Sequence, residues 1–205
     1  MDNEELMCTS CRHQLPVTNY HFVDNEAVKK VLYGRIKLKN ATSLLHFSKK
    51  GLVQELLHNL KYRGHEDIGK HFGQWLGAEL KETGDYNSVD VVIPVPLHKS
   101  KLRSRGYNQV DKFAQEIALA LNVEFRKDLL IKQFATKTQV FKNRLMRYDD
   151  AKAQFKLIDT EILKNKHVLL VDDIITTGAT LETCANELLK TEGLTLSVAT
   201  IAIAD

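Results

Sequence analysis

The stretch VLLVDDIITTGAT, residues 168–180, decides the fold of this 205-residue chain. It begins with an uninterrupted apolar run, which is typical of a strand that is buried on both faces of a parallel sheet. Two adjacent carboxylates, Asp172 and Asp173, follow at the end of that run. Open α/β sheets bind their ligands at the carboxyl ends of the strands, so a binding site is expected here.

The second half of the stretch has the composition of an anion-binding loop. It leads into a helix over 180–190, and small residues before a helix let backbone N–H groups converge on a phosphate. The loop residues are Thr176, Thr177, Gly178, Ala179 and Thr180. The acidic pair beside them could accept sugar hydroxyls or hold Mg²⁺ through water. The plainer alternative is an ordinary strand–turn–helix connection in which Thr180 caps the helix.

Working outward, strands and helices alternate from residue 90 onward. Apolar runs predict strands, and apolar residues at helical spacing predict helices. The expected strands cover 41–47, 90–94, 129–133, 166–171 and 194–204, and the expected helices cover 51–60, 65–82, 107–122 and 180–190. This order predicts an α/β protein with a mainly parallel central sheet flanked by helices. Glycines at 69, 73 and 77 predict that the helix over 65–82 lies close against a neighbour.

Positive charge is concentrated in one quarter of the chain. The whole chain carries a net charge of +3, but residues 99–147 alone carry +8, so the remainder is acidic. Such a segment is either a solvated basic face or a surface that meets phosphates of a small ligand or of nucleic acid. Composition excludes wholesale disorder, and the longest uncharged apolar stretches are too short to cross a membrane.

The sequence IPVPLHKSKLRSRGYNQ, residues 93–109, follows the strand expected at 90–94. The turn after that strand contains Val95 and Pro96, and Pro94 and Pro96 stiffen it. The cations Lys99, Lys101, Arg103 and Arg105 then occupy every second position. In an extended loop they would share one side, which suits a polyanion. The alternative is a lysine-rich surface loop without a ligand.

These two stretches carry a family resemblance. Residues 168–180 resemble the signature of type I phosphoribosyltransferases, which bind 5-phosphoribosyl 1-pyrophosphate (PRPP). Residues 93–109, together with Thr138, Gln139 and Arg147, are similar to the ComF family of competence proteins, although Asp150 stands where that family usually has Asn. The resemblance covers nearly the whole chain and implies a type I phosphoribosyltransferase-like fold.

The resemblance also implies a site and two possible roles. It assigns the acidic pair to the ribose hydroxyls, residues 176–180 to the 5′-phosphate, and the turn from Val95 to the pyrophosphate, with Mg²⁺ accompanying PRPP. One role is DNA uptake in natural transformation, with contact to single-stranded DNA and a helicase partner in the cytoplasm. The other is an active, Mg²⁺-dependent phosphoribosyltransferase of nucleobase or nucleotide metabolism. The acceptor is not identified by the sequence.

The first 25 residues have no clear period and are expected to form a small module ahead of a domain over 40–205. ComF proteins often begin with a four-cysteine zinc knuckle, but this segment has only Cys8 and Cys11. His13 or His21 could complete a mixed zinc site. The alternatives are a metal-free remnant and a redox role of the two cysteines.

Overall fold

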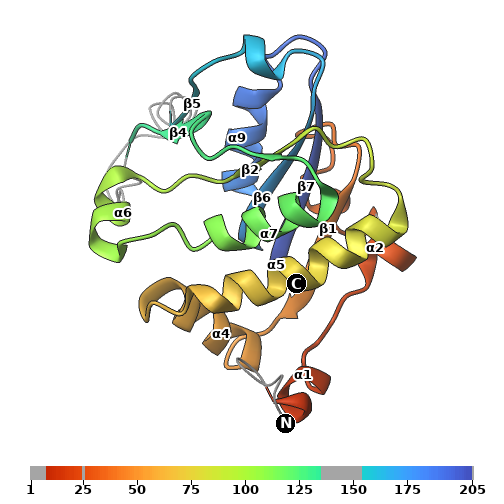
Figure 1. Cartoon of the computed structure of the whole chain (residues 1–205), viewed down its shortest axis with the longest axis vertical. Helices are drawn as coiled ribbons and strands as arrows, with labels where there is room; N and C mark the ends of the chain where they lie inside the picture. Colours follow the sequence, from red (N-terminus) through yellow and green to blue (C-terminus); the bar gives the residue numbers. More distant parts are fainter. Residues whose placement is uncertain (1–7, 25, 135–153, 205) are drawn as a thin grey trace.

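The computed structural model describes residues 8–24, 26–134 and 154–204 (Figure 1). Its centre is a sheet of five parallel strands in the order β1-β7-β6-β2-β3. Their bounds are β1 (Ala41–Phe47), β2 (Val91–Pro94), β3 (Glu124–Phe125), β6 (His167–Ile175) and β7 (Thr195–Ala204). The expected parallel α/β architecture is therefore confirmed.

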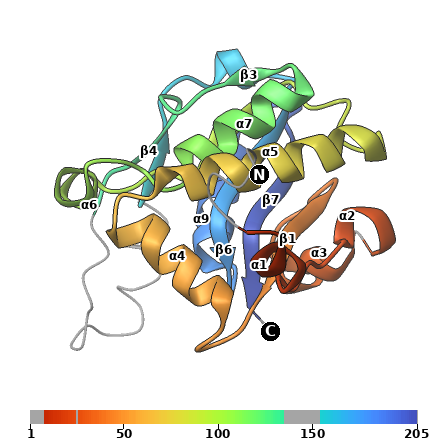
Figure 2. The same cartoon turned by 60° about the horizontal axis from the view of Figure 1, so that its bottom comes forward.

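Helices cover both faces of this sheet, and each face has its own apolar core. On one face pack α4 (Leu52–Tyr62), α5 (Glu66–Thr83) and α7 (Asp111–Leu121). On the other face lie α3 (Glu26–Leu32) and α9 (Ala179–Leu188), as the two views in Figures 1 and 2 show. The strand expected at 129–133 is β4 (Leu130–Lys132), which pairs with β5 (Phe155–Leu157) in a separate antiparallel pair.

The glycines of α5 lie against α7, as their spacing predicted. A Cβ at Gly73 would lie 2.5 Å from the carbonyl oxygen of Phe113, and one at Gly77 would lie 2.7 Å from Cβ of Ala120. No larger residue fits without moving the helices apart. The absence of side chains at these buried glycines therefore allows the close approach of α7, in which Phe113 is fully buried.

The N-terminal residues pack onto the domain. Short helices α1 (Thr9–His13) and α2 (Tyr20–Val23) flank a segment that lies along the outer edge of β1. Thr18 N donates to Leu44 O at 3.0 Å, and His46 N donates to Pro16 O at 2.7 Å. Leu15 is buried in the same core as α4, α5 and α7. The described part of the N-terminus thus shares the domain's core rather than forming one of its own.

Among the residues that the structure describes, no helix has both the length and the apolar character needed to cross a membrane.

Candidate ligand-binding site

The site is expected where neighbouring strands send their connections in opposite directions. From β2 the chain continues through α7 to β3, whereas from β6 it continues through α9 to β7. Helix α7 packs on one face and α9 on the other. The ends of adjacent parallel strands that diverge in this way leave a crevice, and ligands of α/β proteins bind there. The crevice beyond β2 and β6 is therefore the candidate site.

The acidic pair lies at this crevice. The pairing of β2 with β6 ends at Pro94 and Val171, so β6 continues beyond its neighbour. Asp172 and Asp173 are the first residues of that extension, and both are buried, with exposed fractions of 8% and 4%. The sequence predicted that the two carboxylates follow the strand. They lie within it instead, and they are held in place on one side by β7.

Adjacent residues of a strand point to opposite faces of the sheet, so the two carboxylates have different surroundings. Asp173 meets the side of α4 and α7. Its Oδ2 accepts a hydrogen bond from Gln109 Nε2 at 2.8 Å and lies 3.0 Å from Lys61 Nζ. One oxygen of Asp173 thus has both a positively charged and a neutral donor. The sequence pattern gave no role to Gln109. It also gave none to Lys61, because this residue stands in an ordinary amphipathic helix.

Asp172 has less compensation for its burial. Its Oδ1 accepts a hydrogen bond from the backbone N–H of Asp173 at 2.8 Å. Burial, and then the neighbouring charge of Asp173, raise the pKa of Asp172 to about 8. Asp172 therefore holds its proton more tightly than an ordinary carboxyl does. A ligand that brings hydroxyl donors or positive charge would favour the doubly ionised form.

The loop 176–180 adjoins the acidic pair and opens α9. Gly178 has φ +74°, and its carbonyl accepts the N–H of Glu182 at 2.8 Å, which is the first helical bond. The N–H groups of Ala179 and Thr180 come before that bond, so neither donates to a carbonyl within the helix. Apart from Gly178, the five loop residues are exposed, and all five line one small hollow together with Asp172. This is the arrangement expected of an anion cradle.

Gly178 is required by its backbone conformation and by its packing against α3. A Cβ there would lie 2.5 Å from Leu32 Cδ2 and 3.2 Å from Arg35 Nη2, so it would point into α3 rather than into the hollow. The positive φ and this packing require glycine.

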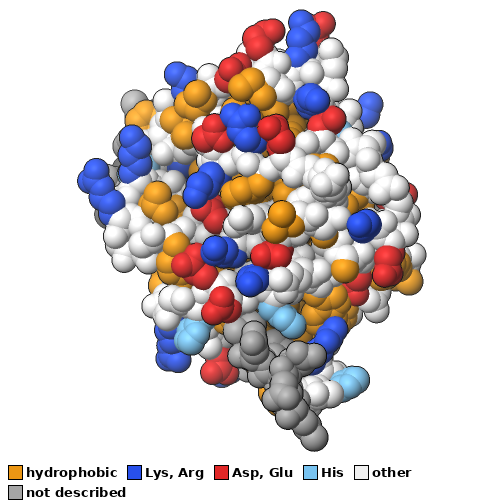
Figure 3. All heavy atoms as spheres, viewed as in Figure 1, with side chains coloured by type: hydrophobic (Ala, Val, Ile, Leu, Met, Phe, Trp, Pro, Cys, Tyr) orange, Lys and Arg blue, Asp and Glu red, His pale blue; other side chains and the backbone are white. Residues whose placement is uncertain are grey.

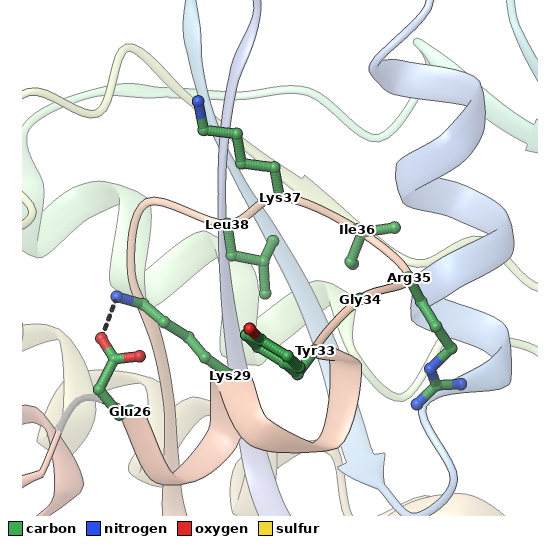
Figure 4. Close-up of a pocket in the computed structure, with 8 residues that line it drawn as sticks. All are labelled: Glu26, Lys29, Tyr33, Gly34, Arg35, Ile36, Lys37 and Leu38. Carbon is green, nitrogen blue, oxygen red and sulfur yellow. Dashed lines mark hydrogen bonds and ion pairs between the residues drawn. The ribbon is translucent and has the colours of Figure 1, made fainter.

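Arg35 is a second residue that sequence reasoning missed. Its Nη2 donates to Thr177 O at 2.8 Å, and its Nη1 donates to Glu182 Oε2 at 2.8 Å. It therefore ties the connection between α3 and β1 to the cradle. Figure 4 shows its guanidinium pointing out of a cavity of about 590 Å³ that α3 and the following loop enclose. That cavity is larger than the hollow, but neither acidic residue lines it.

The turn after β2 borders the crevice from the other strand. Val95 N donates to Val171 O at 2.8 Å, and Val95 O accepts from Asn108 Nδ2 at 3.0 Å. Val95 is buried, and Pro96 is half-buried beside it. Asn108 thus fixes this turn, while its Oδ1 accepts the N–H of Val110 at 3.4 Å just before α7 begins at Asp111.

The four alternating cations do not lie in an extended loop. They belong to helix α6 (Lys99–Arg105). His98 caps the start of this helix, and its Nδ1 accepts the N–H of Ser100. Residues two apart on a helix point in different directions, whereas residues four apart share a face. Lys101 and Arg105 therefore share a face, as do Lys99 and Arg103, so the prediction of one four-cation side is wrong. Lys and Arg side chains project at the edge of the molecule where α6 lies (Figure 3).

The expected zinc site gains no support from the described residues. Among them, no group of three or more His, Cys, Asp or Glu side chains is placed to hold a metal ion. Cys8 Sγ accepts the N–H of Cys11 at the start of α1. His21 Nδ1 lies 3.2 Å from Thr42 Oγ1, and its Nε2 lies 2.9 Å from Glu79 Oε2. His21 is therefore engaged with β1 and α5, while a metal at Cys8, Cys11 and His13 stays a prediction.

The acidic pair fits Mg²⁺ only as part of a complex. Carboxylate oxygens are suitable ligands, and Mg²⁺ is commonly bound through one or two carboxylates plus substrate phosphates. Oδ2 of Asp173 already has two donors. The pair thus suits a metal that arrives with a phosphorylated ligand. Thr138, Gln139, Arg147 and Asp150 lie outside the described residues, so their expected roles stay untested.

Known proteins resemble this chain over its second half and over longer stretches. Residues 112–205 match the phosphoribosyl transferase domain family, a segment that includes β6, the cradle and β7. A DNA utilization protein of Shigella flexneri is 29% identical over 150 residues, which cover 71% of this chain and 65% of that protein. Competence protein F of Haemophilus influenzae is 31% identical over 113 residues, covering 55% of this chain and 49% of its own. The chain thus spans less than two thirds of the length of these relatives.

Among solved structures, an adenine phosphoribosyltransferase has a TM-score of 0.43 and 20% sequence identity, with 73% of this chain and 75% of that chain covered. Residues 112–205 thus match the phosphoribosyl transferase domain family, and the chain is similar to competence protein F and to the DNA utilization proteins.

Proposed function

We propose that this protein binds PRPP in the crevice beyond β2 and β6. The observation that carries the proposal is the position of two buried carboxylates between an anion cradle and the turn at Val95. Ribose hydroxyls would donate to Asp172 and Asp173. The 5′-phosphate would bind the N–H groups and hydroxyls of residues 176–180, and the pyrophosphate would lie toward the turn.

The same arrangement supports group transfer at C1 of the ribose. An acceptor would attack C1 as pyrophosphate leaves, and the carboxylates would stabilise the positive charge that develops on the sugar. Mg²⁺ bound with PRPP would neutralise the leaving group. Asp173 is held for this task by Lys61 and Gln109. A transferase of nucleobase or nucleotide metabolism is therefore the alternative to a protein that only binds PRPP.

Calorimetric titration with PRPP and Mg²⁺ tests the proposal. The double change of Asp172→Asn and Asp173→Asn keeps the shape of both side chains and removes their charge. We expect it to weaken binding by more than about tenfold, because several charge-assisted hydrogen bonds are lost, each stronger than a neutral one. Thr180→Val removes one hydroxyl of the cradle and should weaken the binding of ribose 5-phosphate when that ligand is titrated by itself. If the folded double variant binds as tightly as the parent, the ribose assignment is wrong.

We further propose a cytoplasmic role in DNA uptake, with contact to single-stranded DNA and a helicase partner. The names of the relatives support the role, and the net charge of +8 over residues 99–147 supports the contact. Binding through backbone phosphates depends strongly on salt, with a slope of log K against log salt of about −0.7 for each phosphate neutralised on a single strand. Three or four contacts predict a slope of roughly −2 to −3.

Anisotropy titrations of a labelled oligonucleotide at several salt concentrations measure this slope. Changing Lys101, Arg103 and Arg105 together to Gln should flatten it and weaken binding to all sequences alike, since backbone contacts carry no base information. A parent protein without salt-dependent binding at low salt would contradict the proposed DNA contact and leave PRPP binding unaffected.

A further inference from the structure

A second pocket lies on the α4 side of the acidic pair and has no role in the arrangement above. It has a volume of about 280 Å³ and lies between the end of α4 and helix α6. The side chains that line it are Lys61, Tyr62, Lys101, Ser104, Arg105 and Tyr107. Three of these are cations and none is acidic, so the pocket favours an anionic ligand.

The fold of α6 creates this charge. Lys101 and Arg105 are four residues apart and therefore reach the pocket from one face of the helix. Lys61 enters from the last turn of α4. Cations that the sequence places about 40 residues apart are thus brought to one cavity.

The pocket also has an aromatic platform. Tyr62 is 67% exposed, and the guanidinium carbon of Arg105 lies 5.1 Å from the centre of its ring. The hydroxyl of Tyr107 donates to Leu60 O, which fixes the second ring at the rim. A stacked tyrosine and guanidinium recognise a flat ring, whereas a phosphate alone needs only cations.

The pocket is joined directly to the acidic pair. Lys61 Nζ lies 3.0 Å from Asp173 Oδ2. Arg105 Nη1 donates to Gln109 Oε1, and Gln109 Nε2 donates to the same oxygen of Asp173 at 2.8 Å. A ligand in this pocket would therefore lie next to a ribose bound at Asp173.

We propose that this pocket binds a single nucleotide unit, with its base stacked on Tyr62 and Arg105 and its phosphate neutralised by Lys101 and Lys61. The inference rests on the proposed contact with single-stranded DNA and gives that contact a defined site. The volume lies slightly below the range of about 300–1,000 Å³ that is usual for small-molecule pockets, which favours one unit over two. A free nucleotide has the same chemistry as one unit of a strand.

The test uses Tyr62→Leu, with Tyr33→Leu as its matched control. Both tyrosines are largely exposed, at 67% and 87%, and Tyr33 lies outside this pocket. Lys101→Gln is paired in the same way with Lys70→Gln, an exposed lysine of α5. The probes are a labelled oligo(dT) followed by anisotropy and dTMP followed by calorimetry. Thermal unfolding confirms that each variant is folded.

We expect Tyr62→Leu to weaken oligo(dT) binding about tenfold, the effect of losing one stacked base, while Tyr33→Leu leaves it unchanged. Lys101→Gln should weaken oligo(dT) binding and reduce its salt slope, while Lys70→Gln should do neither. A matching loss for dTMP identifies a free nucleotide as a ligand, whereas a loss for oligo(dT) alone identifies a strand.

The failures of the two proposals can be told apart. If the parent binds oligo(dT) with the expected salt slope and Tyr62→Leu binds equally well, the nucleotide pocket is wrong and the DNA contact stands. If the parent binds neither probe, both are wrong, and PRPP titration still reports on the crevice. If Lys101→Gln weakens PRPP binding while Tyr62→Leu changes nothing, the pocket serves pyrophosphate.

Discussion

Two buried regions of the molecule differ in the residues that form them. One is the contact between α5 and α7, and the other is the acidic pair in the crevice beyond β2 and β6. In the first, glycines bring two helix backbones together over the ring of Phe113. In the second, two adjacent carboxylates are buried with few partners. The first region stabilises the fold, whereas the second lowers the stability of the free protein and prepares it for a ligand. Functional sites commonly carry such a cost.

The largest expected effect is on the helix contact. Gly73→Val would place side-chain atoms where Phe113 O and the side chain of Glu116 already lie. Overpacking of this kind costs about 1–3 kcal/mol when neighbours can adjust, and more when the obstacle is backbone. We expect a loss of at least about 3 kcal/mol in the free energy of unfolding, measured by urea denaturation. Gly84→Val, at a helix end with an open environment, isolates the cost of a positive φ alone.

Where the cradle packs against α3, Gly178→Val should combine strain at φ +74° with a clash against Leu32. We expect destabilisation of about 2–3 kcal/mol, together with loss of ribose 5-phosphate binding. Because this change disturbs the core, the change in binding by itself does not test the cradle. Thr180→Val removes only a hydroxyl and should weaken binding with little change in unfolding temperature.

In the crevice a substitution should increase the stability of the folded protein, whereas the two glycine substitutions should decrease it. Burial raises the pKa of Asp172 to about 8, so the folded protein keeps a proton that the unfolded chain releases above its ordinary pKa. The carboxyl therefore costs stability as pH rises from about 4 toward 8. Asp172→Asn should raise the unfolding temperature by a few degrees at pH 8 and by less at pH 5, while weakening PRPP binding. A lower unfolding temperature at pH 8 would contradict this account.

The smallest expected effect concerns histidines that pack at the sheet and helices. Burial lowers the pKa of His21, His71 and His167. Stability that depends on their neutral forms is complete above the ordinary pKa of about 6.5 and is lost as pH falls through the lowered values. Thermal scans of the Asp172→Asn variant between pH 7.5 and 5, in which the opposite effect of Asp172 is removed, should show a modest decrease, and adding His167→Asn should reduce it. An unfolding temperature that stays constant would indicate that these rings remain accessible to protons.

The comparison also explains what could be predicted from the sequence. Periodicity and glycine spacing identified β1, α5 and its close neighbour, because these features depend on local pattern. Asp172 and Asp173 were found because they follow a buried strand. Lys61, Arg35 and the role of Gln109 were missed, since each acts through a contact between elements far apart in the chain. Helix α6 was mistaken for an extended loop because its cations stand at every second position, a period that matches extended backbone and not a helix.

The N-terminal segment along β1 has a consequence for self-association. An uncovered edge strand offers unpaired N–H and C=O groups to any other strand, including that of a second copy. Here Pro16 and Thr18 bond to that edge, and at the opposite edge β3 has only two residues. Removing the first 19 residues would therefore leave a seven-residue, largely buried strand open to pairing, and aggregation would be the expected outcome.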